Sequence, residues 1–359
     1  MVKLEHKTGK IVRLRNQLLG WYAENRRDLP WRRNSDPYSI WVSEIMLQQT
    51  RVAVVVERYQ AFLKRFPTLL SLALAPEEEV LALWSGLGYY RRAHMLHKAA
   101  QYVADRLQGS LPATADALRR LPGIGAYTAA AIASIAHGEP VAAVDGNVER
   151  VLCRLSGWGA GNRTGGGAAI RRKVEDLAAE LVDPARPGDF NQALMELGAV
   201  LCLPRNPKCP ACPIAGDCKT RGEHKTKPRP PMLNREVAYA LAVRSGRHSG
   251  QVDREVLLEQ RPASLTVMPG LWELPTLLDP AVPDHELRMT LRHSIMQVSY
   301  HVRIRTVFED DVAAIAIAAG ERRWVPLGEA ARVPLTGLAR KVLDRACLLP
   351  TAPLDALPL

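Results

Sequence analysis

LRRLPGIGAYTAAAIASIAHGEPVAAVDGNVERVLCR, residues 118–154, is the stretch that decides the fold. It contains a glycine turn, with Gly123 and Gly125, that opens onto a helix-like run over residues 127–136, and then a carboxylate, Asp145, directly before Gly146. A G-x-G turn at a helix start leaves backbone N–H groups free to bind an anion. Because the net charge is +11 and the pI is near 9.5, a nucleic-acid phosphate is the expected anion. The stretch therefore predicts a reaction on a nucleic-acid strand whose phosphate this turn binds.

The composition is that of a globular protein with a polyanionic partner. At 359 residues the chain predicts two domains, and 47% hydrophobic with 24% charged residues is ordinary for folded proteins. A merely soluble basic protein is the alternative explanation of the charge. No run approaches the roughly 18 apolar residues that span a bilayer, and the N-terminus has no signal-peptide core. We therefore expect an intracellular protein without membrane association.

One carboxylate stands inside an apolar helical pattern. Apolar residues at helical spacing predict helices over 11–25, 39–62, 170–181 and 189–200, and a helix pair within 76–107. Glu44 lies in the second of these, between Val42 and Met46. Loss of solvation in such a setting raises the pKa of a carboxyl group, which suits a general acid. The alternative is that Glu44 faces solvent on an amphipathic helix.

The second carboxylate is expected to stay ionised. Asp145 precedes Gly146-Asn147-Val148-Glu149 at a predicted helix N-terminus, where free N–H groups and the helix dipole favour the charged form. Two carboxyl groups in opposite environments can divide acid and anion roles between them. The alternative is that Asp145 is a plain helix N-cap, a common place for Asp.

Four of the six cysteines form a metal-binding pattern. Cys202, Cys209, Cys212 and Cys218 give the spacing C-x6-C-x2-C-x5-C. Zinc sites usually pair two C-x(2–4)-C knuckles, and the first gap here is too wide for one. Four thiolates suffice for a 4Fe–4S cluster, so we favour iron–sulfur over zinc.

These motifs together resemble a known superfamily. The stretch 118–154 is similar to the helix-hairpin-helix plus Gly/Pro-Asp signature of the base-excision DNA glycosylases, and S-E-I-M-L-Q-Q-T at 43–50 is similar to the MutY-type adenine DNA glycosylases within it. The resemblance covers most of residues 10–225, and the cysteine spacing matches the cluster loop of that family. It implies a mainly α, helix-hairpin-helix glycosylase fold with one 4Fe–4S cluster.

The resemblance assigns roles to residues of this chain. Glu44 is expected to protonate adenine at N7, and Asp145 to stabilise the cation that forms at C1′. Asn147 is expected to orient Asp145, and Tyr127 to lie against the target nucleotide. Further residues expected at the DNA or the base are Trp31, Arg32, Leu47, Gln48, Gln49, Thr50, Gly123, Gly125, Arg205, Lys208 and Ser294, with Leu87 and Tyr89 as a wedge in the base stack.

Tyr127 also bears on the type of reaction. Endonuclease III-type relatives place a lysine at this hairpin position, and its amine attacks C1′ to form a Schiff base that leads to strand cleavage. A tyrosine cannot do so. We therefore expect a monofunctional glycosylase that leaves an abasic site.

The C-terminal third has a different character. Short β segments are predicted at 237–243, 255–259, 298–307 and 324–326, with a helix at 338–348. Gln260-Arg261-Pro262 followed by residues 268–275 resembles the opening of a Nudix-like domain, but the catalytic box is missing, so we expect no magnesium site and no pyrophosphatase activity. In the family such a domain helps to recognise the lesion opposite the adenine. Its usual Phe-Ser-His loop would align just after Ser294 and is not present as such.

The sequence thus predicts the following organisation: a helical glycosylase region over 1–225, a linker over 219–235, an α+β Nudix-like lesion-recognition domain over 236–350 and a tail over 351–359. The expected activity is excision of adenine mispaired with 8-oxoguanine or G in double-stranded DNA, by a monomer in the bacterial cytoplasm or nucleoid. Two alternatives stay open, a related mismatch glycosylase acting on another base and a non-catalytic DNA-structure binder.

Overall fold

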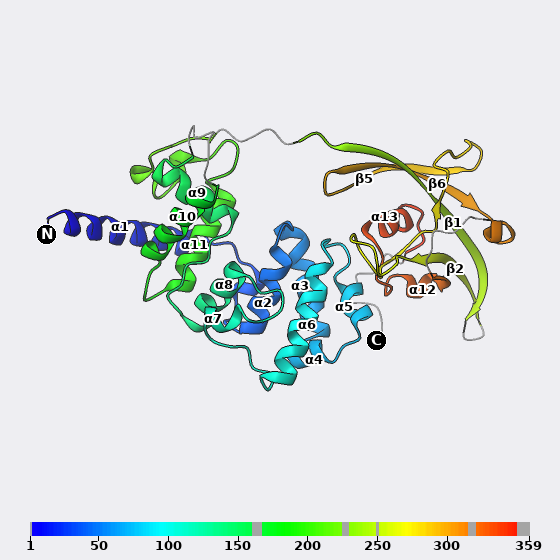
Figure 1. The fold of residues 1–359 in the computed structure, drawn as a ribbon, viewed down its shortest axis with the longest axis horizontal. Helices are drawn as coiled ribbons and strands as arrows, with labels where there is room; N and C mark the ends of the chain where they lie inside the picture. The colour runs from blue at the N-terminus through cyan, green and yellow to red at the C-terminus, as the bar shows by residue number, and fades with distance from the viewer. Residues whose placement is uncertain (1, 160–166, 225–229, 249–250, 315–320, 350–359) are drawn as a thin grey trace. The chain divides into compact units, whose positions relative to one another are not determined.

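The computed structural model describes residues 2–159, 167–224, 230–248, 251–314 and 321–349. The predicted tail and residues 225–229 of the predicted linker lie outside these ranges. The chain forms two compact units (Figure 1): one comprises Met1–Tyr59, Thr68–Ala73 and Lys98–Lys227, the other Gln60–Pro67, Leu74–His97 and Pro228–Leu359. In the described part of the chain, no helix is long and apolar enough to cross a membrane.

The part of the chain before the linker is helical, which confirms the predicted fold of this part. Its helices are α1 (Val2–Asn25), α2 (Pro37–Leu47), α3 (Val52–Arg65), α4 (Leu69–Ala73), α5 (Glu77–Leu83), α6 (Arg91–Arg106), α7 (Ala115–Leu118), α8 (Ala126–His137), α9 (Gly146–Ser156), α10 (Gly167–Leu181) and α11 (Pro187–Val200). Short 3-10 turns lie at Pro30–Arg32, Cys209–Ala211 and Ala215–Asp217.

One predicted helix was wrong. The single helix expected over 39–62 is divided into α2 and α3 by a turn, in which Thr50 N donates to the Leu47 carbonyl. Gln49 adopts a left-handed backbone, with φ of 55°, which cannot continue a right-handed helix. The apolar periodicity runs through both helices, so it hid the break.

Small residues bring three helices of the first unit close together. Four alanines of α8 are buried, Ala129, Ala130, Ala131 and Ala133, and α8 packs against α2. A Cβ atom on Gly188 of α11 would lie 2.8 Å from the Ile135 Cα, so glycine permits the close approach of α11 to α8. A second cluster, which includes Leu18, Leu152 and Leu197, joins α1, α9 and α11. The functional side chains project from the ends of these packed helices.

The second unit contains the β structure expected for the C-terminal part. Its elements are β1 (Leu233–His248), β2 (Gln251–Gln260), β3 (Trp272–Glu273), β4 (Thr276–Leu277), β5 (Leu287–Ile295), β6 (Val298–Val307), β7 (Arg322–Pro326), α12 (Leu327–Ala330) and α13 (Gly337–Arg345). The strand order is β3-β2-β1-β6-β5, with β4 on β1 and β7 on β2. The β1–β6 pairing is parallel, whereas β1 and β2 pair in antiparallel fashion.

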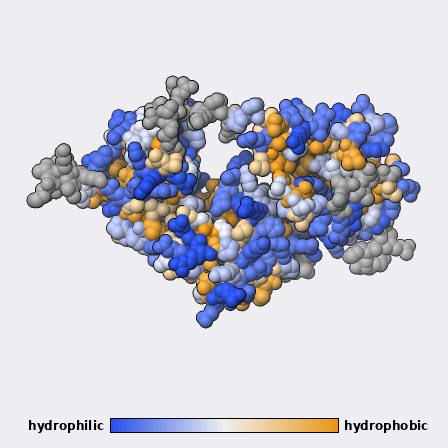
Figure 2. Space-filling view, viewed as in Figure 1, coloured by the Kyte–Doolittle hydropathy of each residue, from blue (hydrophilic) through white to orange (hydrophobic). Residues whose placement is uncertain are grey.

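Apolar burial holds α13 on this sheet. Leu338, Val342 and Leu343 of α13 share one core cluster with Val302 and Ile304 of β6, and the helix lies beside the sheet in Figure 1. Compared with the predicted segments, β1, β2 and β7 are longer, whereas β6 has the predicted bounds. β5 was missed, because its outward-facing residues are polar and break the apolar run. Figure 2 shows hydrophilic side chains over most of the visible surface, with hydrophobic patches between them.

Candidate active site

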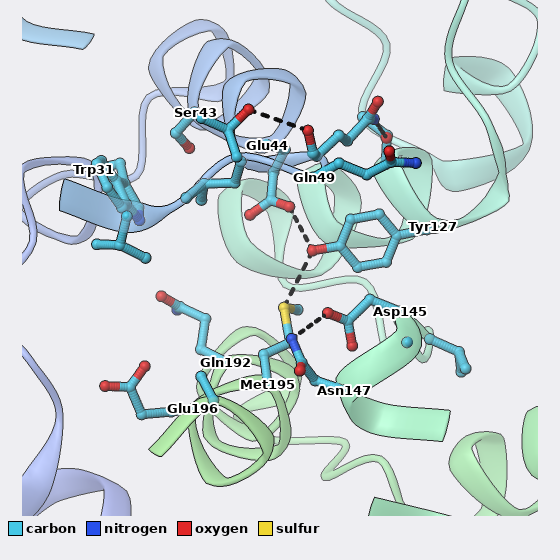
Figure 3. A pocket seen from close by; sticks show the side chains of 18 of the residues that line it. Trp31, Ser43, Glu44, Gln49, Tyr127, Asp145, Asn147, Gln192, Met195 and Glu196 are labelled. Atoms are coloured by element: carbon cyan, nitrogen blue, oxygen red, sulfur yellow. Dashed lines mark hydrogen bonds between the residues drawn. The ribbon is translucent and has the colours of Figure 1, made fainter. Parts of the chain in front are cut away.

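A cavity of about 960 Å³ opens within the first unit. It is lined by twelve residues that the sequence analysis singled out: Trp31, Arg32, Glu44, Leu47, Gln48, Gln49, Thr50, Gly123, Gly125, Tyr127, Asp145 and Asn147. They come from the ends of α2, α8 and α9, from the turns before those helices and from the turn between α2 and α3. The two carboxylates therefore share one cavity (Figure 3).

Glu44 is a buried acid held by a tyrosine. Its side chain points into the cavity from α2, and the residue is 6% exposed. The Tyr127 hydroxyl donates to Glu44 Oε2 at 2.6 Å and also lies 3.2 Å from the Met195 sulfur. Burial, the largest cause, and the charge of Asp145 raise the pKa of Glu44, the hydrogen bond from Tyr127 lowers it, and the net result is a pKa of about 7. The carboxyl group is thus poised to give up a proton near neutral pH.

Asp145 is fixed as the N-cap of α9. Its Oδ1 accepts from the Val148 backbone N–H at 2.7 Å, and its Oδ2 accepts from Asn147 Nδ2 at 2.9 Å. The N-terminus of α9 places partial positive charge beside this carboxylate. Asp145 is therefore both the N-cap of α9 and a residue that lines the cavity.

A chain of hydrogen bonds continues from Asn147 to the cysteine loop. Arg150 Nη2 donates to Asn147 Oδ1 at 2.8 Å and to the Gly198 carbonyl at 2.8 Å, while Arg150 Nε donates to the Cys202 carbonyl at 2.8 Å. A Cβ atom on Gly198 would lie 2.6 Å from Asn147 Cβ, so only glycine fits there without displacing Asn147. The orientation of Asp145 therefore depends on α11 and on the start of the cysteine loop.

Two arginines of the cavity share one buried carboxylate. Arg27 binds Glu196 through Nε and Nη2 at 2.6 and 2.8 Å, and Arg32 Nη2 binds it at 2.8 Å. Burial alone raises the pKa of Glu196, but the hydrogen bonds from Arg27 and Arg32 outweigh burial and lower it to about 2. Glu196 is therefore ionised and fixes both guanidinium groups. Trp31, beside them, packs edge-on against Tyr59 at a centroid distance of 5.5 Å.

Sequence reasoning missed the cavity residues of α11. Gln192, Met195 and Glu196 line the cavity, as does Arg27. The available signal was the spacing of Gln192 and Glu196, because polar residues four apart in an otherwise apolar helix lie on one face. Figure 3 shows both side chains on the α11 side of the cavity.

The other predicted DNA-binding residues do not line this cavity. Leu87 is 4% exposed and Tyr89 is 52% exposed, so of this pair only Tyr89 offers an exposed ring. Arg205, Lys208 and Ser294 are exposed at the surface. Their roles stay predictions.

The four cysteines have the chemistry that a 4Fe–4S cluster needs. All four are free, half-buried thiols, and each of the other three sulfurs acts on Cys212, whose pKa burial raises to about 11. Four thiolates from one loop are the ligand set of a 4Fe–4S cluster. Buried Arg154 donates to Cys202 Sγ at 3.3 Å, a contact that favours a thiolate.

Comparison with known proteins identifies the family. Residues 42–177 match the HhH-GPD superfamily base excision DNA repair protein model, and residues 202–218 match the iron–sulfur binding domain of endonuclease III. The structure of a thermostable thymine-DNA glycosylase aligns at a TM-score of 0.55 and 31% identity, over 60% of this chain and 98% of that one. The chain therefore belongs to the HhH-GPD superfamily of base excision DNA repair proteins, and the predicted 4Fe–4S cofactor is confirmed.

Within that superfamily the chain is similar to adenine DNA glycosylases. The adenine DNA glycosylase of Homo sapiens is 48% identical over 221 residues, which are 59% of this chain and 40% of that protein. That of Arabidopsis thaliana is 39% identical over 316 residues, which are 76% of this chain and 48% of that protein. The chain thus spans about half the length, or less, of these curated relatives.

Proposed function

We propose that this protein is a monofunctional DNA glycosylase that removes adenine mispaired with 8-oxoguanine or G, in base excision repair. The observation that carries the proposal is the pairing of a buried acid, Glu44, with a capped carboxylate, Asp145, in one cavity of the first unit. The similarity to adenine DNA glycosylases supports adenine as the base.

Glu44 is the proton donor in this proposal. Adenine is a poor leaving group until a ring nitrogen carries a proton, and a carboxyl group of pKa about 7 still holds its proton at neutral pH. Glu44 gives that proton to adenine N7 as the glycosidic bond breaks. Tyr127 holds the carboxyl group in place through its hydrogen bond to Oε2.

Asp145 is the anionic partner. The sugar becomes cation-like at C1′ as the base departs, as in glycoside hydrolysis generally, and a fixed carboxylate stabilises that charge. Val148 and Asn147 hold both oxygens of Asp145, so the carboxylate does not need to reorganise during the reaction. Tyr127 has no amine with which to form a Schiff base, so the product is an abasic site in an uncut strand.

The chain's remaining features serve DNA binding in this proposal. The N–H groups of the Gly123–Gly125 turn, at the start of α8, bind a phosphate, and the exposed Arg205 and Lys208 of the cysteine loop bind others. The 4Fe–4S cluster, held by the four cysteines, supplies the loop's structure rather than electrons. Tyr89 enters the base stack, with Leu87 behind it, and Gln48, Gln49 and Thr50 enter the duplex beside the target pair.

We assign lesion recognition to the C-terminal part. The predicted boundaries, with a glycosylase region over 1–225, a linker over 219–235 and a Nudix-like domain over 236–350, belong to this proposal. Ser294, exposed on β5, is the candidate contact with 8-oxoguanine. We further propose that the protein acts as a monomer on double-stranded DNA inside the cell.

One assay separates the proposal from its rivals. The protein is incubated with duplexes that contain A opposite 8-oxoguanine, G/T or thymine glycol, and the products are resolved with and without alkali. Alkali-dependent cleavage of the first duplex alone supports the proposal. Cleavage of the G/T duplex would favour a thymine glycosylase, a rival that Glu44 disfavours because thymine has no N7 to protonate. Binding without cleavage would indicate a non-catalytic DNA-structure binder.

A further inference from the structure

The turn between α5 and α6 is unusually well defined by its own contacts. Gly86, Gly88 and Tyr89 all have left-handed backbones, with φ of 96°, 68° and 47°. The Trp84 indole N–H donates to the Gly88 carbonyl at 3.2 Å. Arg92 Nη2 donates to the Gly88 and Leu87 carbonyls, each at 3.0 Å, and its guanidinium lies over the Tyr89 ring at 5.6 Å. Residues 85–90, here called the wedge turn, thus present Tyr89 from a fixed backbone.

Residues from the far end of the chain hold both ends of this turn. Within the second unit, the Tyr90 hydroxyl donates to the Leu335 carbonyl at 2.8 Å, and Arg340 Nε donates to the Ser85 hydroxyl at 2.7 Å. Arg340 also donates from Nη2 to the Ala331 carbonyl at 3.3 Å. These partners are 245 and 255 residues away from the turn along the chain.

The side chains that make these contacts are buried. Ser85 is 0% exposed and Tyr90 4% exposed, and burial lowers the pKa of Arg340. A guanidinium taken out of water needs acceptors in fixed positions, because an unsatisfied buried donor carries a desolvation cost. The hydroxyl of Ser85 is such an acceptor, and it is the first residue of the wedge turn. Displacing Arg340 therefore affects that turn directly.

We propose that the C-terminal segment 331–340 positions the wedge turn, with Arg340 as its key positioning residue. The inference rests on the proposed function, because it gives Tyr89 the task of entering the base stack. Unstacking a base costs a few kcal/mol, and an inserted side chain offsets this cost only if its backbone stays in place. The C-terminal part thereby assists base extrusion as well as any reading of the lesion.

The test compares Arg340→Met with Arg345→Met. Arg345 lies on the same helix, α13, but is exposed, so its variant controls for the loss of one positive charge. Hydrogen–deuterium exchange of a peptide that covers residues 84–92 reports on the turn without requiring activity. Fluorescence of 2-aminopurine at the target position of a bound duplex reports base extrusion.

We expect at least tenfold faster exchange in the wedge turn and a loss of most of the 2-aminopurine signal in Arg340→Met, with neither change in the control. Unchanged exchange would overturn the inference, as would faster exchange with undiminished extrusion. Ser85→Ala supplies a second, smaller perturbation if Arg340→Met does not fold, and the same two outcomes decide it. If the wild-type protein excises no adenine, the proposed function fails, yet the exchange result still decides whether segment 331–340 holds the turn.

Discussion

Replacing Glu44 by glutamine should remove the activity and yet stabilise the protein at alkaline pH. Burial raises the pKa of Glu44 from its ordinary 4.5 to about 7, a rise of about 2.5 pKa units, or about 3.4 kcal/mol at 1.36 kcal/mol per unit. The folded state binds this proton more tightly than the unfolded chain does. The corresponding stability is fully present below pH 4.5 and is lost as the pH rises through about 7.

The expected result is a difference that depends on pH. Because Glu44→Gln keeps the shape and cannot ionise, the wild type should lose about 2.5 kcal/mol of unfolding free energy relative to the variant between about pH 5 and pH 8.5. Urea unfolding at both pH values, monitored by circular dichroism, gives the free energy of unfolding of the wild type and of the variant. The test is how much the difference between them changes with pH. A Glu44→Gln effect that is equal at the two pH values would refute the raised pKa, and with it the case for Glu44 as an acid at neutral pH.

Three further outcomes follow from the same site. Asp145→Asn should abolish excision while the affinity for mispaired DNA, measured by gel shift, stays within a few-fold; persistent excision would remove Asp145 from the mechanism. Gly198→Ala should slow single-turnover excision about 10- to 100-fold, because the new methyl group displaces Asn147, whereas Gly216→Ala, with open space around it, should not. Cys212→Ser should lose the visible absorbance of the cluster and weaken DNA binding; an intact spectrum would exclude Cys212 as a ligand.

The features that the sequence revealed were carried by neighbouring residues. The turn before α8 and the N-cap role of Asp145 each involve only a few consecutive residues, and the four cysteines lie within residues 202–218, so local chemistry sufficed to predict them. The break after α2 was also local, but its signal, a left-handed Gln49, has no reliable mark in the residue type.

What the sequence did not reveal depends on long-range pairing. Glu196 meets Arg27 across 169 residues, and no motif links the two. The parallel pairing of β1 with β6 likewise joins strands that are distant along the chain. The sequence predicted one more helix pair within 76–107, yet by their contacts Leu74–His97 belong to the unit that holds the sheet. Such groupings come from packing, which single-sequence periodicity does not encode.

The anchoring of the wedge turn has a consequence for how the chain is made. Ser85 and Tyr90 leave the ribosome 255 and 245 residues before the groups they bind, an interval of roughly 12–50 s at typical rates of synthesis. Throughout that time the turn has only its local contacts, such as those of Trp84 and Arg92 with the Gly88 carbonyl. The wedge turn therefore reaches its anchored form only after residues 331–340 have been made.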